Sequence, residues 1–450
     1  MADYSRLRIA RRALGAGVLS GVIAVAGLSA PSPAAAANPV TPGNFTGYGF
    51  DQCDAPSQNA MDRWRKHSKF AAVGIYISGK SRGCRKQTHL SPTWVRNQQA
   101  RGWRLLPISL GRQASCNPTY PRYSDDPRIS SNPTDRYAAA QRQGIAEANS
   151  TVNAARHYGI RAGSTMFYDL EGFDIDNKRC RESAMWFVSA WNYRIKKLGY
   201  RPALYSSAAS GIKAMYDVLR AHPRGFTYPA DGWIADWDGR ANTSTKFLPG
   251  WVWDNHRRVK QYRGPHKETH GGVTIEIDSN FVDLGRGSSA RSMSHCGGVP
   301  VSFTGYPNLA PKTSSYTPSP VYVKALQCML SERGSFRGAI NGTYGPGVVK
   351  AVNDWQRAHG LQVRKTWTMS AWKTLWAANS RPLLKRGAAG ERVRDLQRAL
   401  NSTTAKERAK VTGVFDRSTE VAVIAYQKRL GRTSHGIATE VTWYDLAHGR

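Results

Sequence analysis

The fold is decided by residues 164–172, which read STMFYDLEG. The apolar residues leading to Tyr168 predict a buried β-strand, and the acids Asp169 and Glu171 follow at its carboxyl end. Side chains alternate between the two faces of a strand, so acids at positions i and i+2 share one face, roughly 6.5 Å apart. Repulsion lets one keep a proton near neutral pH while the other stays ionised. A strand that merely ends in solvated acids is the alternative, and the neighbouring strands must decide.

Seven further strand-like runs occur within residues 44–297, a length close to the roughly 250 residues of a (β/α)8 barrel. Helical periodicity is strongest over residues 135–158 and 182–198. Alternating strands and helices predict a parallel sheet, and eight strands predict that it closes into a barrel. The predicted strands are residues 48–51, 71–78, 104–110, 165–171, 202–206, 232–236, 259–262 and 274–278.

Four of these predicted strands end in acids, namely Asp51, the pair Asp169 and Glu171, Asp236, and Asp278. In such barrels the C-terminal strand ends meet on one face, where the chemistry takes place. Because the body of each strand is apolar and expected to be buried, solvation alone explains this recurrence poorly. The pattern predicts a carboxylate site of the kind that glycoside cleavage requires, with one proton donor and one ionised partner.

The same strand ends carry motifs that resemble those of family 25 glycoside hydrolases, the Chalaropsis-type lysozymes. They also resemble those of the related glycoside-hydrolase-like domain of exported actinobacterial proteins. The resemblance spans residues 44–297 and implies cleavage of the β-1,4 bond after N-acetylmuramic acid in peptidoglycan. The motifs are Gly49-Phe50-Asp51, Tyr168-Asp169-Leu170-Glu171, Trp233-Ile234-Ala235-Asp236-Trp237, Gln261-Tyr262 and Ile277-Asp278-Ser279-Asn280-Phe281.

The resemblance also implies a role for each acid. Glu171 would be the general acid, and Asp169 would orient the substrate N-acetyl group or stabilise the oxocarbenium-like centre. Asp51 and Asp278 would complete the acidic floor, tuning this pair and binding sugar hydroxyls. The identity of the nucleophile or base stays open between Asp169, Asp278 and the N-acetyl group of the substrate.

Further residues near the strand ends are candidates for binding sugar. The rings of Tyr168, Trp233, Trp237 and Tyr262 could stack on sugar rings, and Asp236 could bind hydroxyl groups. Packing in the core is the alternative role for each ring. Trp237 directly follows a strand-end acid and is the strongest candidate for a stacking platform.

Residues 1–37 have the pattern of a signal peptide. Four arginines between residues 6 and 12 precede an apolar run over residues 13–30, and small residues follow up to Ala37. Secretion by the general or the twin-arginine route fits this pattern, and no later stretch predicts a transmembrane anchor. All six cysteines follow residue 37, and in an exported chain they predict up to three disulfides whose pairing stays open.

The chain has 64 basic and 31 acidic residues, which gives a net charge of +33. Such a field favours polyanionic partners. Together with export it predicts binding to peptidoglycan or another cell-wall glycan and to anionic wall polymers, and it argues against nucleic acid. The spacing of cysteines and histidines predicts no metal site, and no cofactor is expected. The pair His266 and His270 is expected to lie in a loop.

Residues 298–320 are rich in Pro, Ser and Thr and predict a linker. An internal repeat follows, in which residues 323–330 match 393–400 and Trp372 matches Trp443. The two copies, at 321–378 and 382–448, each predict a small three-helix domain. They resemble the peptidoglycan-binding domain type 1, which implies a wall tether. The expected fold class is thus α/β, a (β/α)8 TIM-like barrel followed by two all-α domains.

Two functions remain from the sequence. The first is an exported, muramidase-like glycoside hydrolase that depends on Glu171. The alternative is a non-catalytic wall-binding protein that keeps a hydrolase-like barrel. Gln52 and Cys53 follow the first motif where the lysozymes usually have Val and Ser, and this departure leaves both functions open.

Overall fold

The structure is a computed structural model that describes residues 38–450. The predicted signal peptide, residues 1–37, lies outside the described residues. Among the helices of residues 38–450, none combines the length and the apolar character needed to cross a membrane.

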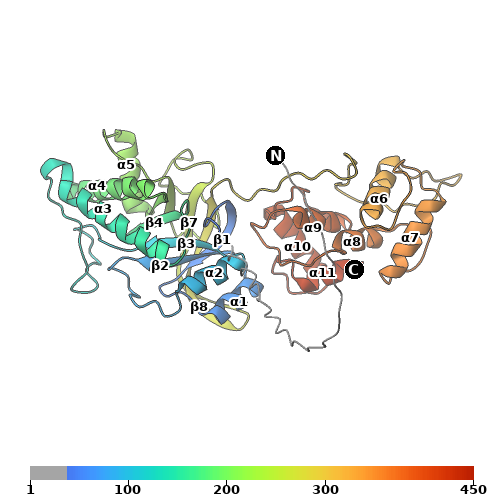
Figure 1. The fold of residues 1–450 in the computed structure, drawn as a ribbon, viewed down its shortest axis with the longest axis horizontal. Helices are drawn as coiled ribbons and strands as arrows, with labels where there is room; N and C mark the ends of the chain where they lie inside the picture. Colours follow the sequence, from blue (N-terminus) through green and yellow to red (C-terminus); the bar gives the residue numbers. More distant parts are fainter. Residues whose placement is uncertain (1–37) are drawn as a thin grey trace, which may run out of the picture. The chain divides into compact units, whose positions relative to one another are not determined.

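Eight strands close into a barrel in sequence order, as predicted (Figure 1). Each strand from the second to the seventh pairs in parallel with the strand before it. Apolar runs rich in Val, Ile and Leu form these strands because both of their faces are covered. The strands are β1 (Phe45–Asp51), β2 (Ala72–Ser78), β3 (Arg104–Ser109), β4 (Thr165–Leu170), β5 (Arg201–Ser207), β6 (Asp231–Ala235), β7 (Arg257–His270) and β8 (Val273–Leu284).

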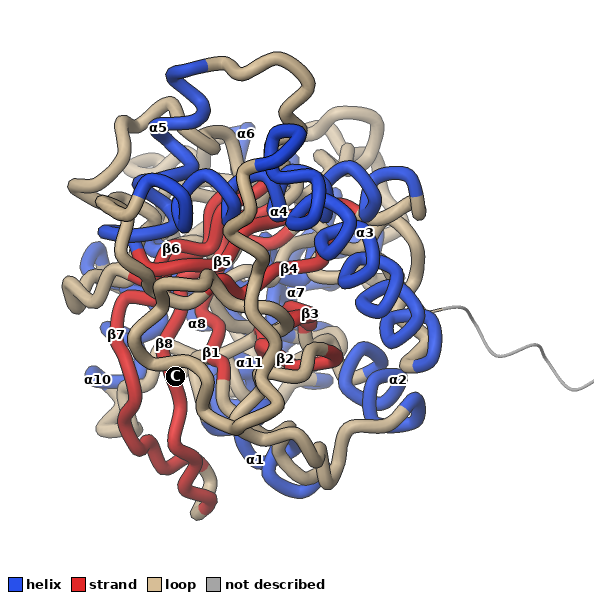
Figure 2. The backbone as a smooth tube through the Cα atoms, turned by 90° about the vertical axis from the view of Figure 1, so that its left-hand side faces the viewer, coloured by secondary structure: helices blue, strands red, loops and turns tan. Residues whose placement is uncertain are grey.

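The last strand departs from a regular (β/α)8 barrel, because β8 runs antiparallel to both β7 and β1. Only Gly271 and Gly272 separate β7 from β8, and both have positive φ, which suits a tight hairpin turn. A parallel return would need a crossover of a dozen or more residues. The outer halves of β7 and β8 project from the barrel as a hairpin (Figure 2). His266 and His270 lie in β7, so the expectation that they lie in a loop is wrong.

This reversal changes how Asp278 reaches the site. The predicted strand 274–278 is only the outer part of β8, which continues to Leu284. Asp278 therefore lies where β8 enters the barrel, opposite Asp51 in the β1–β8 register. It reaches the same face of the barrel as the strand-end acids, although its strand runs the other way.

Helices cover the outside of the barrel. The two strongest helical predictions are confirmed by α3 (Thr134–His157) and α4 (Lys178–Lys197), which pack side by side (Figure 1). Residues 236–256, between β6 and β7, form no helix. The other elements around the barrel are α1 (Gln58–His67), α2 (Pro92–Ala100), the π-helical turn η1 (Ala208–Ile212) and α5 (Lys213–Ala221).

Aromatic rings fill the inside of the barrel beneath the acids. Tyr205 and Trp233 stack with their centroids 4.4 Å apart, and Phe167 meets Trp233 edge to face at 5.2 Å. All three side chains are buried. This layer closes the barrel, so the acids lie on a packed floor and not at the mouth of a channel.

The two repeats have the same construction, each with three α-helices as predicted. In the first, Gln327 accepts a hydrogen bond from the backbone N–H of Gly342 (2.8 Å); in the second, Gln397 accepts the equivalent bond from Gly413 (2.9 Å). Each glutamine thereby holds the turn that follows its own helix. The first repeat contains α6 (Pro320–Glu332), α7 (Pro346–Ala358) and α8 (Met369–Ala377), and the second α9 (Glu391–Asn401), the 3₁₀ turn η2 (Ala405–Glu407), α10 (Arg417–Arg429) and α11 (Glu440–Ala447).

The segment expected to be a linker, residues 298–320, is packed against the first repeat over part of its length. The indole N–H of Trp372 donates to the carbonyl of Pro307 (3.0 Å), and Leu309 pairs with Trp367 through two backbone hydrogen bonds. The second repeat has a counterpart, in which Trp443 donates to Pro382 (2.8 Å). Each repeat therefore includes an extended segment before its first helix.

All six cysteines form disulfides, which agrees with the prediction of up to three. Two of the bonds lie within the barrel domain, and the third joins the segment after the barrel to α6. The pairs are Cys53–Cys84, Cys116–Cys180 and Cys296–Cys328.

Candidate active site

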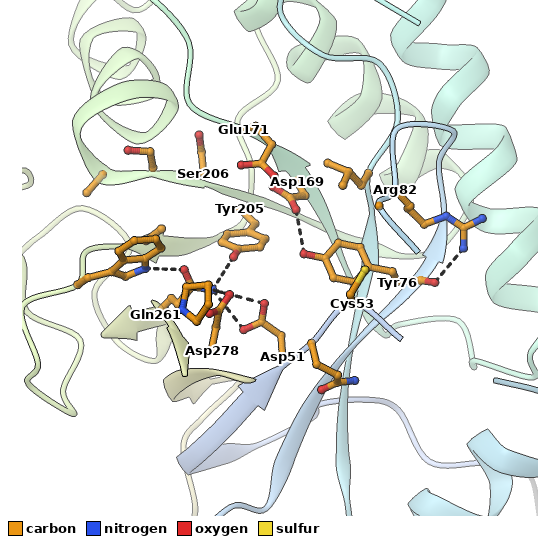
Figure 3. A pocket seen from close by; sticks show the side chains of 18 of the residues that line it. Asp51, Cys53, Tyr76, Arg82, Asp169, Glu171, Tyr205, Ser206, Gln261 and Asp278 are labelled. Carbon is orange, nitrogen blue, oxygen red and sulfur yellow. Dashed lines mark hydrogen bonds between the residues drawn. The ribbon is translucent and has the colours of Figure 1, made fainter. Parts of the chain in front are cut away.

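A cavity of about 890 Å³ opens at the C-terminal ends of the parallel strands. It contains the acids that the sequence predicted, contributed by β1, the end of β4, the end of β6 and β8 (Figure 3). The predicted residues that line it are Asp51, Asp169, Glu171, Asp236, Trp237 and Asp278. The barrel thus brings together residues that are far apart in the sequence.

The carboxylates of Asp51 and Asp278 lie beside two side-chain amides, Gln261 from β7 and Asn280 from β8. The side-chain N–H2 of Asn280 donates to Asp51 Oδ1 at 2.5 Å. The amide nitrogen of Gln261 lies 3.3 Å from Asp51 Oδ1 and 3.1 Å from Asp278 Oδ2, and it also approaches the Tyr205 hydroxyl at 2.6 Å (Figure 3). Gln261 is therefore the residue that joins the two acids.

The orientation of the Gln261 amide is set by Trp237. The indole N–H of Trp237 can only donate, and it lies 2.8 Å from Gln261 Oε1. The amide oxygen must face the indole, so the N–H2 group faces Asp51 and Asp278. The exposed tryptophan, the buried Asp51 and the half-buried Asp278 thus belong to one hydrogen-bond network.

The end of β4 is held by Gln113. Its amide N–H2 donates to the carbonyl of Asp169 (3.0 Å), and its Oε1 accepts from the backbone N–H of Glu171 (2.9 Å). The two acids differ in their surroundings: Asp169 is buried and accepts from the Tyr76 hydroxyl (3.2 Å), whereas Glu171 is partly exposed and forms an ion pair with Arg122 (3.2 Å). The predicted i, i+2 pair thus has one buried and one accessible member.

The crowding of acids shifts their proton affinities upward. Burial, and then the charge of Glu171, raise the pKa of Asp169 well above its usual value. Burial raises the pKa of Asp51 to about 6, although hydrogen bonds from Asn280 and Gln261 oppose this rise. Burial and the charges of Asp51, Glu171 and Glu276 raise the pKa of Asp278 to about 8. At neutral pH, Asp51 is therefore mostly ionised and Asp278 mostly protonated, which is the division of labour expected of a catalytic acid cluster.

Trp237 and Asp236 lie on the wall of the cavity. Trp237 is 63% exposed, and its ring lies against Gly264, where an added Cβ would come within 2.7 Å of the indole. Glycine at position 264 therefore lets the ring lie flat against β7. Asp236 accepts a hydrogen bond from the Thr245 hydroxyl (2.7 Å).

The other three aromatic candidates do not face the cavity. Tyr168 is buried on the outer side of β4, where it packs on Phe187 and Trp191. Trp233 lies in the packed layer below the acids. Tyr262 is buried next to Gln261, and neighbouring residues in a strand point to opposite faces. These three rings take the packing role that was the alternative from the sequence.

Several residues of the site were not predicted. Gln261 belongs to one of the sequence motifs, but no role was predicted for it. Tyr76 and Tyr205 point inward near the ends of β2 and β5, so the alternation of side chains along these strands could have identified both. Arg122 and Gln113 come from the long loop between β3 and α3, which carries no periodic signal.

The described residues offer little to a metal ion. Between residues 38 and 450, the single group of three close ligand side chains is Cys296, Cys328 and Glu332. The two cysteines form a disulfide and have no thiolate to offer.

Comparison with protein families assigns both parts of the chain. Residues 62–282 match the family described as "Rv2525c-like, glycoside hydrolase-like domain". Residues 321–367 and 389–446 match the family described as "Putative peptidoglycan binding domain", in agreement with the internal repeat. None of the curated proteins compared with the chain matches it.

Three of the solved structures that are similar to this chain each align with about half of it. An uncharacterized B. stearothermophilus protein is 18% identical (52% of this chain, 95% of that chain, TM-score 0.33). The Mycobacterium tuberculosis Tat-secreted protein Rv2525c, in complex with L-tartrate, is 11% identical (52% and 95%, TM-score 0.34). The Clostridium perfringens spore cortex lytic enzyme SleM is 14% identical (54% and 71%, TM-score 0.36). By these matches, the chain is similar to the Rv2525c-like, glycoside hydrolase-like family in its barrel and to the putative peptidoglycan binding domain in each of its two repeats.

Proposed function

We propose that this protein is an exported, muramidase-like glycoside hydrolase that cleaves β-1,4 bonds of peptidoglycan by carboxylate acid/base catalysis. One observation carries the proposal: Asp51, Asp169, Glu171 and Asp278 converge in one open cavity. The cavity lies on the barrel face where chemistry is found in this class of fold. The glycoside hydrolase-like description of the barrel family supports the reaction, and the description of the repeats supports peptidoglycan as the target.

Glu171 is the proposed general acid. Its side chain is 36% exposed, so it can reach a bound glycan, whereas Asp169 beside it is buried. Glu171 would pass a proton to the glycosidic oxygen as the bond to the anomeric carbon breaks. Water would then add to that carbon, giving up a proton to a carboxylate of the site, and this forms the new reducing end.

The other acids would act on the positive charge that develops at the anomeric carbon. Asp169, whose raised pKa favours the protonated form, would orient the substrate N-acetyl group, or would stabilise the charge directly once it has lost its proton. Asp51, ionised near neutral pH, would supply the fixed negative charge of the floor, and Asp278 would hold a proton beside it.

Trp237 and Asp236 are the proposed binding residues. The exposed indole face suits stacking on a sugar ring, and Asp236 could accept hydrogen bonds from sugar hydroxyls. Stacking would place the glycan over a ring that is itself hydrogen-bonded to the acid network through Gln261.

The remaining parts of the chain would deliver the barrel to its polymer. We propose that residues 1–37 direct export, which agrees with three disulfides in the described residues. The repeats would bind the wall and raise the local concentration of substrate. The positive net charge would favour binding of the protein to anionic polymers of the wall.

The test is reducing-end release from purified peptidoglycan by the full chain without residues 1–37. We expect release by the wild type and a loss of at least a hundredfold in Glu171→Gln, because general acid catalysis contributes roughly 10²–10⁴-fold. Asp217→Asn is a matched control, since it changes an acid on α5 outside the cavity. Wall binding without any release would instead assign the barrel a purely binding role.

A further inference from the structure

A second cavity, of about 440 Å³, lies beside the acid cavity. It is formed by the loop between β6 and β7, and it shares Asp236 and Trp237 with the acid cavity. Trp237 therefore lines both cavities. A glycan stacked on this ring would have a neighbouring unit or substituent next to the second cavity.

The loop that forms the second cavity is held by a buried cation. Lys260 is 0% exposed, and its ammonium donates to both Asp238 oxygens (2.9 Å each), to Asn242 Oδ1 (2.8 Å) and to the carbonyl of Ser244 (2.8 Å). An ammonium has three protons, so this acceptor shell satisfies it fully. The loop contains no helix or strand, but its shape is held by the hydrogen bonds that it makes with the side chain of Lys260 in β7.

The charges around the second cavity are not balanced. Its two acids already have partners, since Asp238 is bound by Lys260 and Asp236 by Thr245. The lining also includes Arg240 and Lys246, and no carboxylate within residues 38–450 forms an ion pair with either. Asp238 and Lys260 cancel one another, whereas the Thr245 hydroxyl leaves the charge of Asp236 in place. Arg240 and Lys246 against Asp236 therefore leave an excess of one positive charge in the second cavity, whereas the charge of the neighbouring acid cavity is negative.

We infer that the second cavity binds an anionic substituent of the glycan, a carboxylate or a phosphate, through Arg240 and Lys246. This inference rests on the proposed function, because it assumes that a glycan lies on Trp237. Arginine and lysine donate charge-assisted hydrogen bonds to such oxyanions, and the side-chain N–H2 of Asn242 and the hydroxyl of Ser244 can add neutral donors. A glycan without negative charge would gain nothing from the two cations.

The test measures binding, so that it does not depend on turnover. The full chain carrying Glu171→Gln, with residues 1–37 removed, is titrated calorimetrically with three probes. These are the neutral oligosaccharide chitotetraose, disaccharide–tetrapeptide fragments of peptidoglycan, and the same glycan carrying a phosphate group in place of the peptide. The variant is Arg240→Gln with Lys246→Gln. The control is Arg161→Gln with Lys197→Gln, which removes equal charge from exposed positions at the opposite end of the strands.

We expect the Arg240 and Lys246 variant to raise Kd for the anionic probes about tenfold, because each exposed charge contact contributes roughly 0.2–1 kcal/mol. Kd for chitotetraose should change less than twofold, and the control should leave all three values unchanged. A larger effect on one anionic probe would identify peptide carboxylates or phosphate as the natural group. Equal weakening for the neutral probe, or no weakening for either anion, would overturn the inference. A wild-type chain that fails to cleave peptidoglycan would refute the proposed function without altering these binding ratios.

Discussion

Replacing Asp278 by Asn should stabilise the barrel at alkaline pH. In the folded protein the pKa of Asp278 is about 8, against 3.8 for a free side chain. A carboxyl with a raised folded pKa contributes stability below pH 3.8, and this contribution is lost as the pH rises through 8. Wild type should therefore lose stability between pH 4 and pH 8, whereas Asp278→Asn carries no charge to bury.

The magnitude follows from the two pKa values. One pKa unit corresponds to about 1.4 kcal/mol, so the full rise corresponds to roughly 5–6 kcal/mol of unfolding free energy. Asp278 titrates together with its neighbours, and its Oδ1 has no hydrogen-bond partner among the described residues, so the new amide nitrogen would also be unpaired. These two effects reduce the expected gain above pH 8 to about 2–3 kcal/mol. The gain falls as the pH is lowered, and at pH 4, where Asp278 is protonated, the unpaired amide should leave the variant about 1–2 kcal/mol less stable than wild type.

Calorimetry of the full chain from pH 4 to pH 9 would test this prediction, because it resolves the barrel transition from those of the repeats. For a domain of this size, about 2–3 kcal/mol corresponds to a rise in Tm of roughly 4–12 °C. The same variant should lose glycan cleavage, since stability and activity oppose one another at a strained site. A variant with a lower Tm than wild type at pH 8–9, or with the same difference in Tm from wild type at every pH, would refute the electrostatic reasoning.

Three further predictions concern the surroundings of the acids. Lys260→Met should lower the unfolding free energy of the barrel by about 1–3 kcal/mol, because it removes the ammonium hydrogen bonds to Asp238, Asn242 and Ser244; unchanged denaturant midpoints would contradict this. Trp237→Phe keeps a stacking ring but removes the N–H that orients Gln261, so kcat should fall about tenfold with little change in KM, and an altered KM alone would argue against this coupling. Joint replacement of Cys53 and Cys84 by Ser removes a disulfide between residues 31 positions apart. The unfolding free energy, measured with heat or denaturant, should fall by roughly 3–4 kcal/mol, because the unfolded chain gains conformational freedom. An unchanged unfolding free energy would contradict this.

Much of the barrel could be predicted from local pattern. Apolar runs of strand length marked all eight strands, and the acids after them marked the face that carries the cavity. The strands could be predicted because both of their faces are buried, so their apolar composition distinguishes them from the surrounding loops and helices. The Gly271-Gly272 pair is also a recognisable turn signal. Because only these two residues separate the last two strands, the pair could have indicated that β8 runs antiparallel to β7.

The orientation of the aromatic residues required a stricter use of alternation. If Asp169 points inward, its neighbour Tyr168 must point outward, and the same holds for Gln261 and Tyr262. The depth of Trp233 is different, because alternation places a side chain inside the barrel without saying how far below the opening it lies. Arg122 could not be predicted at all, since it reaches Glu171 from a loop whose path depends on tertiary contacts.

The measurement that tests the central claim most directly is the identity of the sugar at the newly formed reducing end. Peptidoglycan would be digested with the full chain lacking residues 1–37, reduced with borohydride, and analysed by mass spectrometry beside Glu171→Gln. The account predicts reduced N-acetylmuramic acid at the new ends in the wild-type digest and none in the variant. Reduced N-acetylglucosamine, equal release by both proteins, or no release by either would contradict it.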